Sequence, residues 1–378
     1  MRKVIEFIFS ATAVCMLFSS CKENNAEPLS PAIDTPSPHL HQIADALCKP
    51  LTPDLFYSRD VVCSSPKDVM QWFDIATSGR IYYSQKNNEQ IVIGRAPGAN
   101  EAAWSFDHTM KLVYFGHGDT VDVEENIDGK TYIWVQSNGT QKNGKADYWG
   151  SLSVSRIEFE PGRKYEHCGG KTYFYTGHLG LITDIDFVNR KFFAGTFVAG
   201  FFVATTFDLD EVLSLPEKDI NVSTVVEGKE YKRTVRGYDL ADLKPLGQFK
   251  LLNGAPNKES DVLSYDHQGH AIYGDYIYLM EGNTVTVSEG KSCKAFVTVF
   301  DLGGNVVIPR TEVKAADDRE AWLSAGYEGS LEPEGAVARA DGLYLGFVSK
   351  PTDTSKPRLT HILKYKCDLC DIKNNTKN

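Results

Sequence analysis

The chain has 378 residues, of which 40 are Lys or Arg and 50 are Asp or Glu, giving a formal net charge of −10. This length fits one large domain or two small ones. The basic residues are scattered and form no arginine-rich stripe, so the composition argues against nucleic acid as a partner.

The first twenty residues resemble an export signal. Arg2 and Lys3 give a positive start, and a mostly apolar stretch runs from Ile5 to Phe18. That stretch is shorter and more interrupted than the ~20 apolar residues of a membrane span. Small residues directly before Cys21 resemble a bacterial lipobox, which predicts that residues 1–20 are removed as a lipoprotein signal peptide and that Cys21 is lipidated. The alternative is an ordinary secretory signal with an incidental cysteine.

Lipidation would place the protein in the cell envelope of a bacterium, where the outer membrane is the expected site of anchoring and the lipid is the only membrane contact. Residues 21–42 hold four prolines among small polar residues and are typical of a flexible tether. An N-terminal extension is predicted at residues 43–68, a folded domain at 69–370 and a tail at 371–378. Helix is expected only at His39–Leu47 and Ser65–Val69.

Six cysteines remain when Cys15 and Cys21 are set aside. In an exported protein an even number favours disulfides, with fifteen possible pairings. A Cys-x-x-Cys pair near the C-terminus has no second such pair or histidine pair beside it, so a structural disulfide is expected there in preference to zinc. The six are Cys48, Cys63, Cys168, Cys293, Cys367 and Cys370.

Short strand-like runs rich in Tyr, Phe, Val and Ile recur along the chain, and helical periodicity is nearly absent. Five segments share a fuller pattern, in which a polar start leads to an alternating strand, a polar turn and an aromatic strand. Their expected turns are Ser78-Gly79, Asp128-Gly129, Asn189-Arg190, Gly274-Asp275 and Asp341-Gly342.

The five copies are spaced as the blades of a propeller would be. Taken from Gln71, His117, Asp184, Gln268 and Glu334, they are separated by 46, 67, 84 and 66 residues. Four-stranded blades take about 40–50 residues, and long insertions account for the rest. The pattern therefore predicts an all-β fold, a five-bladed β-propeller. A β-sandwich, which needs fewer strands, and a solenoid are the alternatives.

Several motifs resemble one β-propeller family. They are Gln71 before an alternating strand, the "GHG" at 116–118 followed by an acidic strand and "YIW", and the late "EPEG…GLYLGF". The family includes teichoic acid biosynthesis protein C-like proteins and the receptor-binding proteins of some phages, with helveticin-type bacteriocins as more distant relatives. The resemblance covers about Val69 to Lys366.

This resemblance implies a five-bladed propeller associated with cell-wall polymers or surface glycans, and it transfers no catalytic residue. The chain departs from the family at Trp72-Phe73, where the family more often has a small residue after the glutamine. The matching positions are Gln71, Gly116, His117, Gly118, Trp134, Glu334 and Gly335.

A propeller brings the starts of its innermost strands together at one end of the axis, so a polar mouth is predicted there. Carboxylates, amides and imidazoles suit a hydroxyl-rich glycan. Oxygen ligands could also hold Ca²⁺, and no other cofactor is expected. The alternative is that these groups bond to each other and to trapped water. The predicted ligand-binding residues are Gln71, His117, Asp119, Asp184, His267, Gln268 and Glu334, with Asp186 and His270 beside them.

Three other functions are weighed against glycan binding. "GHGD" superficially matches the His-x-Asp of zinc aminoacylase-type peptidases, but the alternating α/β pattern of that fold is missing. A polysaccharide-cleaving enzyme is the main alternative: a glycosidase would take two carboxylates from Asp119, Asp184 and Glu334, and a lyase would use His117 or His267. A protein-interaction propeller would instead present an apolar patch on its rim.

The large aromatic residues are expected in structural roles. The run Phe192, Phe193, Phe197, Phe201 and Phe202 is predicted to pack between blades. The expected loop tryptophans are Trp104, Trp149 and Trp322.

Overall fold

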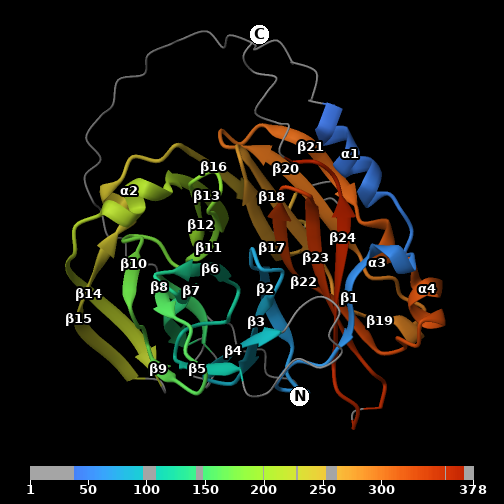
Figure 1. Ribbon diagram of the computed structural model, residues 1–378, viewed down its shortest axis with the longest axis horizontal. Coiled ribbons are helices and arrows are strands. Elements are labelled where there is room, and N and C mark those ends of the chain that lie inside the picture. The colour runs from blue at the N-terminus through green and yellow to red at the C-terminus, as the bar shows by residue number, and fades with distance from the viewer. Residues whose placement is uncertain are drawn as a thin grey trace, which may run out of the picture. The chain divides into compact units, whose positions relative to one another are not determined.

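Five sheets surround a central axis in the computed structural model (Figure 1), which confirms the predicted five-bladed β-propeller. The structure describes residues 38–96, 108–141, 148–198, 200–226, 229–252, 262–353 and 355–369. The predicted signal peptide, Cys21, most of the tether, the tail, Trp104 and Cys370 lie outside these residues. Within them, no helix has the length and apolar character that crossing a membrane requires.

Each blade consists of four or more strands. Blade 1 contains β2 (Met70–Ile75), β3 (Ile81–Asn87), β4 (Gln90–Ala96), β5 (Thr109–Val113) and β9 (Lys164–Glu166). Blade 2 contains β6 (Val121–Ile127), β7 (Lys130–Gln141), β8 (Tyr148–Glu158), β10 (Lys171–Phe174), β15 (Lys229–Asp239) and β14 (Lys218–Val226). Blade 3 contains β11 (Ile182–Asp186), β12 (Lys191–Val198), β13 (Phe201–Asp208) and β16 (Gly247–Leu252).

Blade 4 contains β17 (Asp266–Tyr273), β18 (Tyr276–Gly282), β20 (Ala295–Asp301) and β21 (Val306–Glu312). Blade 5 contains β22 (Ser330–Arg339), β23 (Gly342–Lys350), β24 (Leu359–Lys366) and β1 (Phe56–Val61), with the short β19 (Val285–Thr286) on the other side of β22. The α-helices are α1 (Pro38–Leu47), α2 (Leu209–Ser214), α3 (Lys314–Asp317) and α4 (Arg319–Ser324).

The five repeated segments of the sequence supply the innermost strands, which are β2, β6, β11, β17 and β22 (Figure 1). Each pairs with the next strand through the turn that the sequence predicts. Residues with positive φ, such as Gly79 and Gly274, occupy these turns. Neighbouring inner strands contact one another around the ring. The starts of these strands therefore come together at one end of the axis.

The ring closes through the N-terminal part of the chain. β1 pairs antiparallel with β24, so blade 5 takes its outermost strand from the N-terminal part of the chain, whereas β22, β23 and β24 come from the C-terminal part. The hydrogen bonds between these strands oppose separation of the first and last blades. The sequence prediction assigned residues 43–68 to an extension outside the propeller, and the pairing of β1 moves part of that segment into the fifth blade.

Aromatic residues fill the spaces between blades, as the sequence predicts for most of them. Phe192 packs with Trp134 and Tyr173 between blades 2 and 3, and Phe193 and Phe202 pack between blades 3 and 4. Phe201 does not fit the prediction. It begins β13 at the open end of blade 3, where no neighbouring blade covers it, and it is 39% exposed.

Several local predictions need correction, although α1 confirms the helix at residues 39–47. Ser65–Val69 forms a turn and no helix: the Asp68 N–H donates to the Ser65 carbonyl at 3.1 Å, and Gln85 hydrogen-bonds to backbone groups of both residues. Trp322 lies in α4, fully buried, and its indole N–H donates to a backbone carbonyl. Trp149 belongs to strand β8.

The predicted disulfide framework is not found among the five cysteines in the described part of the chain, each of which is a free thiol. Cys63 packs in the core, where its Sγ lies 3.4 Å from Thr360 Oγ1 and burial raises its pKa to about 12. Cys293 and Cys367 are also buried, and burial raises the pKa of both thiols. These cysteines act as small core residues.

Candidate functional site

Three inner strands have a register irregularity at a residue predicted for the mouth. The pairing of β2 with β3 shifts at Gln71, that of β17 with β18 shifts at Gln268, and that of β22 with β23 shifts at Glu334. A bulge leaves one residue out of the ladder and turns its side chain in a new direction. The same device therefore recurs at the mouth end of blades 1, 4 and 5.

Gln71 and Glu334 meet across the junction of blades 1 and 5. Gln71 Nε2 donates to Glu334 Oε1 at 3.5 Å, and both side chains are buried. Gly335 has a φ of 82°, and a Cβ there would come within 3.1 Å of Phe73. Burial, together with the carboxylates of Glu332 and Asp119, raises the pKa of Glu334 well above its ordinary value. The Glu334 carboxyl therefore favours its protonated form.

The Gly116–Asp119 loop is fixed by two buried side chains. Gln136 Oε1 accepts hydrogen bonds from the backbone N–H of Gly118 at 2.8 Å and of Asp119 at 3.0 Å, and Ser84 Oγ donates to the Gly118 carbonyl at 2.6 Å. Gly116 and Gly118 have φ values of 140° and 105°, which favour glycine. The two glycines let the loop turn sharply at the top of blade 2.

This loop orients His117 and Asp119 as a pair. His117 Nδ1 lies 2.6 Å from Asp119 Oδ1, and about a third of the Asp119 side chain is exposed. Asp119 also acts electrostatically on Glu334 and His267, so the structure brings these three groups to the same mouth. Within the described residues, no group of three or more His, Cys, Asp or Glu side chains is arranged to hold a metal.

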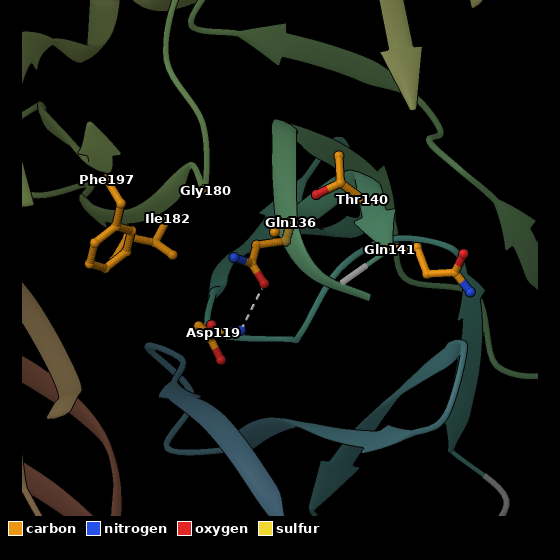
Figure 2. Close-up of a pocket in the computed structure, with 8 residues that line it drawn as sticks. Asp119, Gln136, Thr140, Gln141, Gly180, Ile182 and Phe197 are labelled. Atoms are coloured by element: carbon orange, nitrogen blue, oxygen red, sulfur yellow. Dashed lines mark hydrogen bonds between the residues drawn. The ribbon is translucent and has the colours of Figure 1, made fainter. Parts of the chain in front are cut away.

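A groove of about 370 Å³ opens beside Asp119. Figure 2 shows Asp119 and Gln136 near one another, with Ile182 and Phe197 facing them from blade 3. Thr140 and Gln141, at the end of β7, line the groove farther from Phe197. The groove therefore combines hydrogen-bonding groups from blade 2 with an apolar wall from blade 3.

The two histidines of blade 4 differ in their surroundings. His270 is fully buried, packs between the rings of Trp72 and Phe193 at 4.4 and 5.2 Å, and lies 3.0 Å from the Thr183 carbonyl through Nε2. It is a core residue. His267 stacks on Phe202 nearer the mouth, and burial lowers its pKa to about 4, which keeps it neutral at pH 7.

Asp184 does not occupy the mouth, which corrects the sequence prediction. Its Oδ2 accepts a hydrogen bond from the Ile272 backbone N–H of blade 4 at 2.6 Å. Asp122 bonds in the same way to Ile185 of blade 3 at 3.2 Å, and Asp74 to Val123 of blade 2 at 2.9 Å. The three aspartates hold equivalent positions, and each joins its blade to the next one.

This equivalence also shows which residue of blade 3 lies at the mouth. Gln71 precedes Asp74 by three residues, as Asp119 precedes Asp122, so the position equivalent to these mouth residues in blade 3 belongs to Leu181. Leu181 is buried and apolar. Blade 3 therefore supplies an apolar side chain where the other blades supply Gln71, Asp119, Gln268 and Glu334.

Below the mouth, these aspartates form a buried acidic cluster that the sequence prediction missed. The cluster consists of Asp74, Asp122, Asp184 and Asp186, and Arg339 of blade 5 pairs directly with Asp74. Asp186, expected beside the mouth, accepts instead from the Gly274 N–H of blade 4 at 2.7 Å. Burial raises the pKa of Asp184 to about 7, and Arg339 acts in the opposite direction.

Replacing Gln136 by leucine is expected to loosen the Gly116–Asp119 loop. The change removes the acceptor of two backbone N–H groups and the donor to the Leu181 carbonyl at 3.3 Å. A buried polar group without a partner costs about 1–3 kcal/mol, so we expect a loss of about 2–4 kcal/mol in the free energy of unfolding. Urea denaturation measures it, and a loss below about 1 kcal/mol would show that Gln136 does not fix the loop.

Comparison with known proteins supplies distant structural similarity only. No protein-family model matches the chain, and a search of curated proteins finds no match. A thermostable family-43 glycoside hydrolase is similar at 10% identity over 81% of this chain and 92% of its own, with a TM-score of 0.41. The α-L-arabinofuranosidase PaAbf62A from Podospora anserina, crystallised with cellotriose, has 7% identity over 84% of this chain and 93% of its own, with a TM-score of 0.35.

A Dyadobacter fermentans protein of unknown function is similar at 11% identity over 82% of this chain and 98% of its own, also with a TM-score of 0.35. Identities and TM-scores this low carry no argument about function. The function has to be argued from the chain's own residues.

Proposed function

We propose that this propeller binds a polysaccharide at its axial mouth. The observation that carries the proposal is the groove beside Asp119, in which a carboxylate, a carboxamide and a hydroxyl face an apolar wall of Ile182 and Phe197. A sugar presents hydroxyls around its ring and an apolar C–H face, so it needs both kinds of surface. The polar groups alone, or the apolar wall alone, would match only one of these two surfaces of a sugar.

The rigidity of the mouth supports the proposal. Gln136 and Ser84 fix the Gly116–Asp119 loop, and Gln71 contacts Glu334 across the first and last blades. Polar groups that are already oriented before a ligand arrives lose little conformational freedom on binding. A glycan would therefore meet a preorganised set of hydrogen-bonding groups.

The sequence supports two finer parts of the proposal. The family resemblance favours a cell-wall polymer or surface glycan as the ligand, and the lipobox-like sequence favours attachment to the membrane through a lipid on Cys21. Anchoring would hold many sites close together, so modest affinity at each would suffice. Labelling of cells with a fatty-acid probe tests the anchor: the wild type should take up label and Cys21→Ala should not.

Cleavage of the bound polysaccharide is the second candidate, because the mouth holds two carboxyl groups in unlike environments. Glu334 is buried with a raised pKa, partly because of Asp119, whereas Asp119 is partly exposed and paired with His117. Glycosidases use such a pair, one carboxyl as the acid and the other as base or nucleophile. Glu334 would be the acid here, and neutral His267 would serve a lyase as base.

Native gels containing soluble xylan, arabinan, mannan, β-glucan, pectin or wall teichoic acid test the proposal, with mass spectrometry of each incubated mixture. Retardation without new reducing ends or unsaturated products would support binding, and such products would support cleavage. If none of these polymers slows the migration of the wild-type protein and none is cleaved by it, both the binding and the cleavage hypotheses are overturned.

A further inference from the structure

A cluster of exposed apolar side chains lies at one edge of blade 3. Leu179 is 61% exposed, Val198 37%, Phe201 39% and Leu252 52%. Val198 pairs with Phe201 across β12 and β13, and Phe201 pairs with Leu252 across β13 and β16. These four are among only nine large apolar side chains exposed in the described residues, so their proximity is not the usual scatter of a protein surface.

This edge faces the same way as the mouth. β11 begins at Ile182, which lines the groove beside Asp119. The strands of blade 3 run antiparallel, so the end of β12 at Val198, the start of β13 at Phe201 and the end of β16 at Leu252 lie at the same end of the blade as Ile182. The exposed edge is therefore a continuation of the mouth surface.

A crevice of about 410 Å³ adjoins this edge on the side of blade 2. Its lining includes His178 and Val198, whereas the groove is lined by Gly180 and Phe197, so neighbouring residues of the same two segments line both cavities. Each cavity is near the lower end of the ~300–1,000 Å³ range of ligand sites. A ligand occupying both would be larger than a single sugar.

The crevice repeats the chemistry of the groove. Phe201 supplies a partly exposed ring, and Gln248 supplies an amide whose Nε2 bonds to Thr205 Oγ1 at 3.0 Å. Lys250 also lines the crevice, and its ammonium can donate to a sugar oxygen. Burial and the charge of Lys250 lower the pKa of His178, which leaves Lys250 as the cation of the crevice.

We propose that the crevice and the mouth-side edge of blade 3 form a second sugar subsite, so that the ligand is an internal stretch of a long polysaccharide that continues outward from the axial mouth. This inference rests on the proposed function and names the form of its ligand. If only the end of a polysaccharide were bound at the mouth, the exposed edge of blade 3 and the crevice would contact no part of the ligand.

Competition by fragments of different length tests the subsite. Disaccharides and hexasaccharides prepared from each polymer that retards the wild type are added to the native gels. The hexasaccharide should release the wild type at a concentration at least tenfold lower than the disaccharide. The double variant Phe201→Ala, Leu252→Ala should lose most of this advantage while responding to the disaccharide as before, and Lys250→Met should show an intermediate loss.

Leu246→Ala is the matched control, because Leu246 is 48% exposed and precedes the opposite end of β16. Leu246→Ala should keep the wild-type ratio between the disaccharide and hexasaccharide concentrations that release the protein. The thermal midpoints of all variants check that they fold. Equal competition by the two fragments on the wild type, or an unchanged ratio in both the double variant and Lys250→Met, would overturn the subsite while leaving binding at the mouth intact. If no polymer retards the wild type, the proposed function itself fails and the subsite with it.

Discussion

Replacing Arg339 by methionine is expected to lower the free energy of unfolding by about 3 kcal/mol at pH 8. Arg339 pairs with buried Asp74 and donates to the Ile75 carbonyl of blade 1 at 3.2 Å. Methionine keeps much of the side-chain volume but leaves the acidic cluster without its cation. Some 28% of the Arg339 side chain is exposed, so the loss should lie at the lower end of the range for a buried pair.

The pH dependence of this loss follows from the cluster. Burial raises the pKa of Asp122 and Asp184, that of Asp184 to about 7, so the folded protein retains protons that the unfolded chain releases. Stabilisation from these groups is present at low pH and is lost as pH rises through about 7. Without Arg339, which acts to lower the pKa of Asp184, more of that stabilisation should be lost between pH 5 and pH 8.

Urea denaturation of the wild type and Arg339→Met at pH 5 and pH 8 measures both effects. Arg163→Met is the control, since Arg163 is 62% exposed and forms a surface pair with Glu160, so its replacement should leave the stability nearly unchanged at both pH values. A loss for Arg339→Met of the same size at both pH values would show that Arg339 does not act through the acidic cluster.

Replacing Asp119 by asparagine is expected to weaken polysaccharide binding tenfold to a hundredfold without a comparable loss of stability. The change keeps the shape of the side chain and removes the charge that lies beside the groove and that, in the proposed complex, would accept a hydrogen bond from a sugar hydroxyl. Hydrogen bonds to charged groups contribute about 1.5–3 kcal/mol, which corresponds to that range. Isothermal titration with a polymer that retards the wild type measures the change.

Glu334→Gln separates binding from cleavage at the same mouth. Burial and the nearby carboxylates raise the pKa of Glu334 well above its ordinary value, so glutamine should be tolerated better there than at an exposed carboxylate, and the thermal midpoint checks that the variant folds. If the wild type releases products, loss of the acid should lower kcat/KM by about 10²–10⁴. Unchanged cleavage in Glu334→Gln would remove Glu334 as the acid, and unchanged affinity in Asp119→Asn would remove Asp119 from the binding site.

The fold was predictable because it is repeated five times in the chain. Gln71, Gln268 and Glu334 each begin an alternating strand followed by a turn and an aromatic strand, and these segments become inner strands. The ring closure through β1 was missed, because it depends on pairing between opposite ends of the chain. A single strand carries no signal of so distant a partner.

The mouth was predictable in part. The sequence placed Gln71 and Glu334 at the starts of their strands. The bulges that turn their side chains depend on how each strand pairs with its neighbour, which the sequence does not show. Asp184 was misplaced because blade 3 has Leu181 at the mouth position, and the first polar residues beyond it are Thr183 and Asp184. An acidic residue inside an apolar strand, as in "FDI" and "VDV", was an available signal for the buried cluster.

Hydrogen–deuterium exchange of the wild type, with and without a polymer that retards it in the gels, tests the central claim most directly. The account predicts slower exchange in the Gly116–Asp119 loop and in the segment from Leu179 to Ile182, on both sides of the groove. Protection confined to the β14–β15 hairpin or to the outer strands of blades 4 and 5 would contradict binding at the axial mouth.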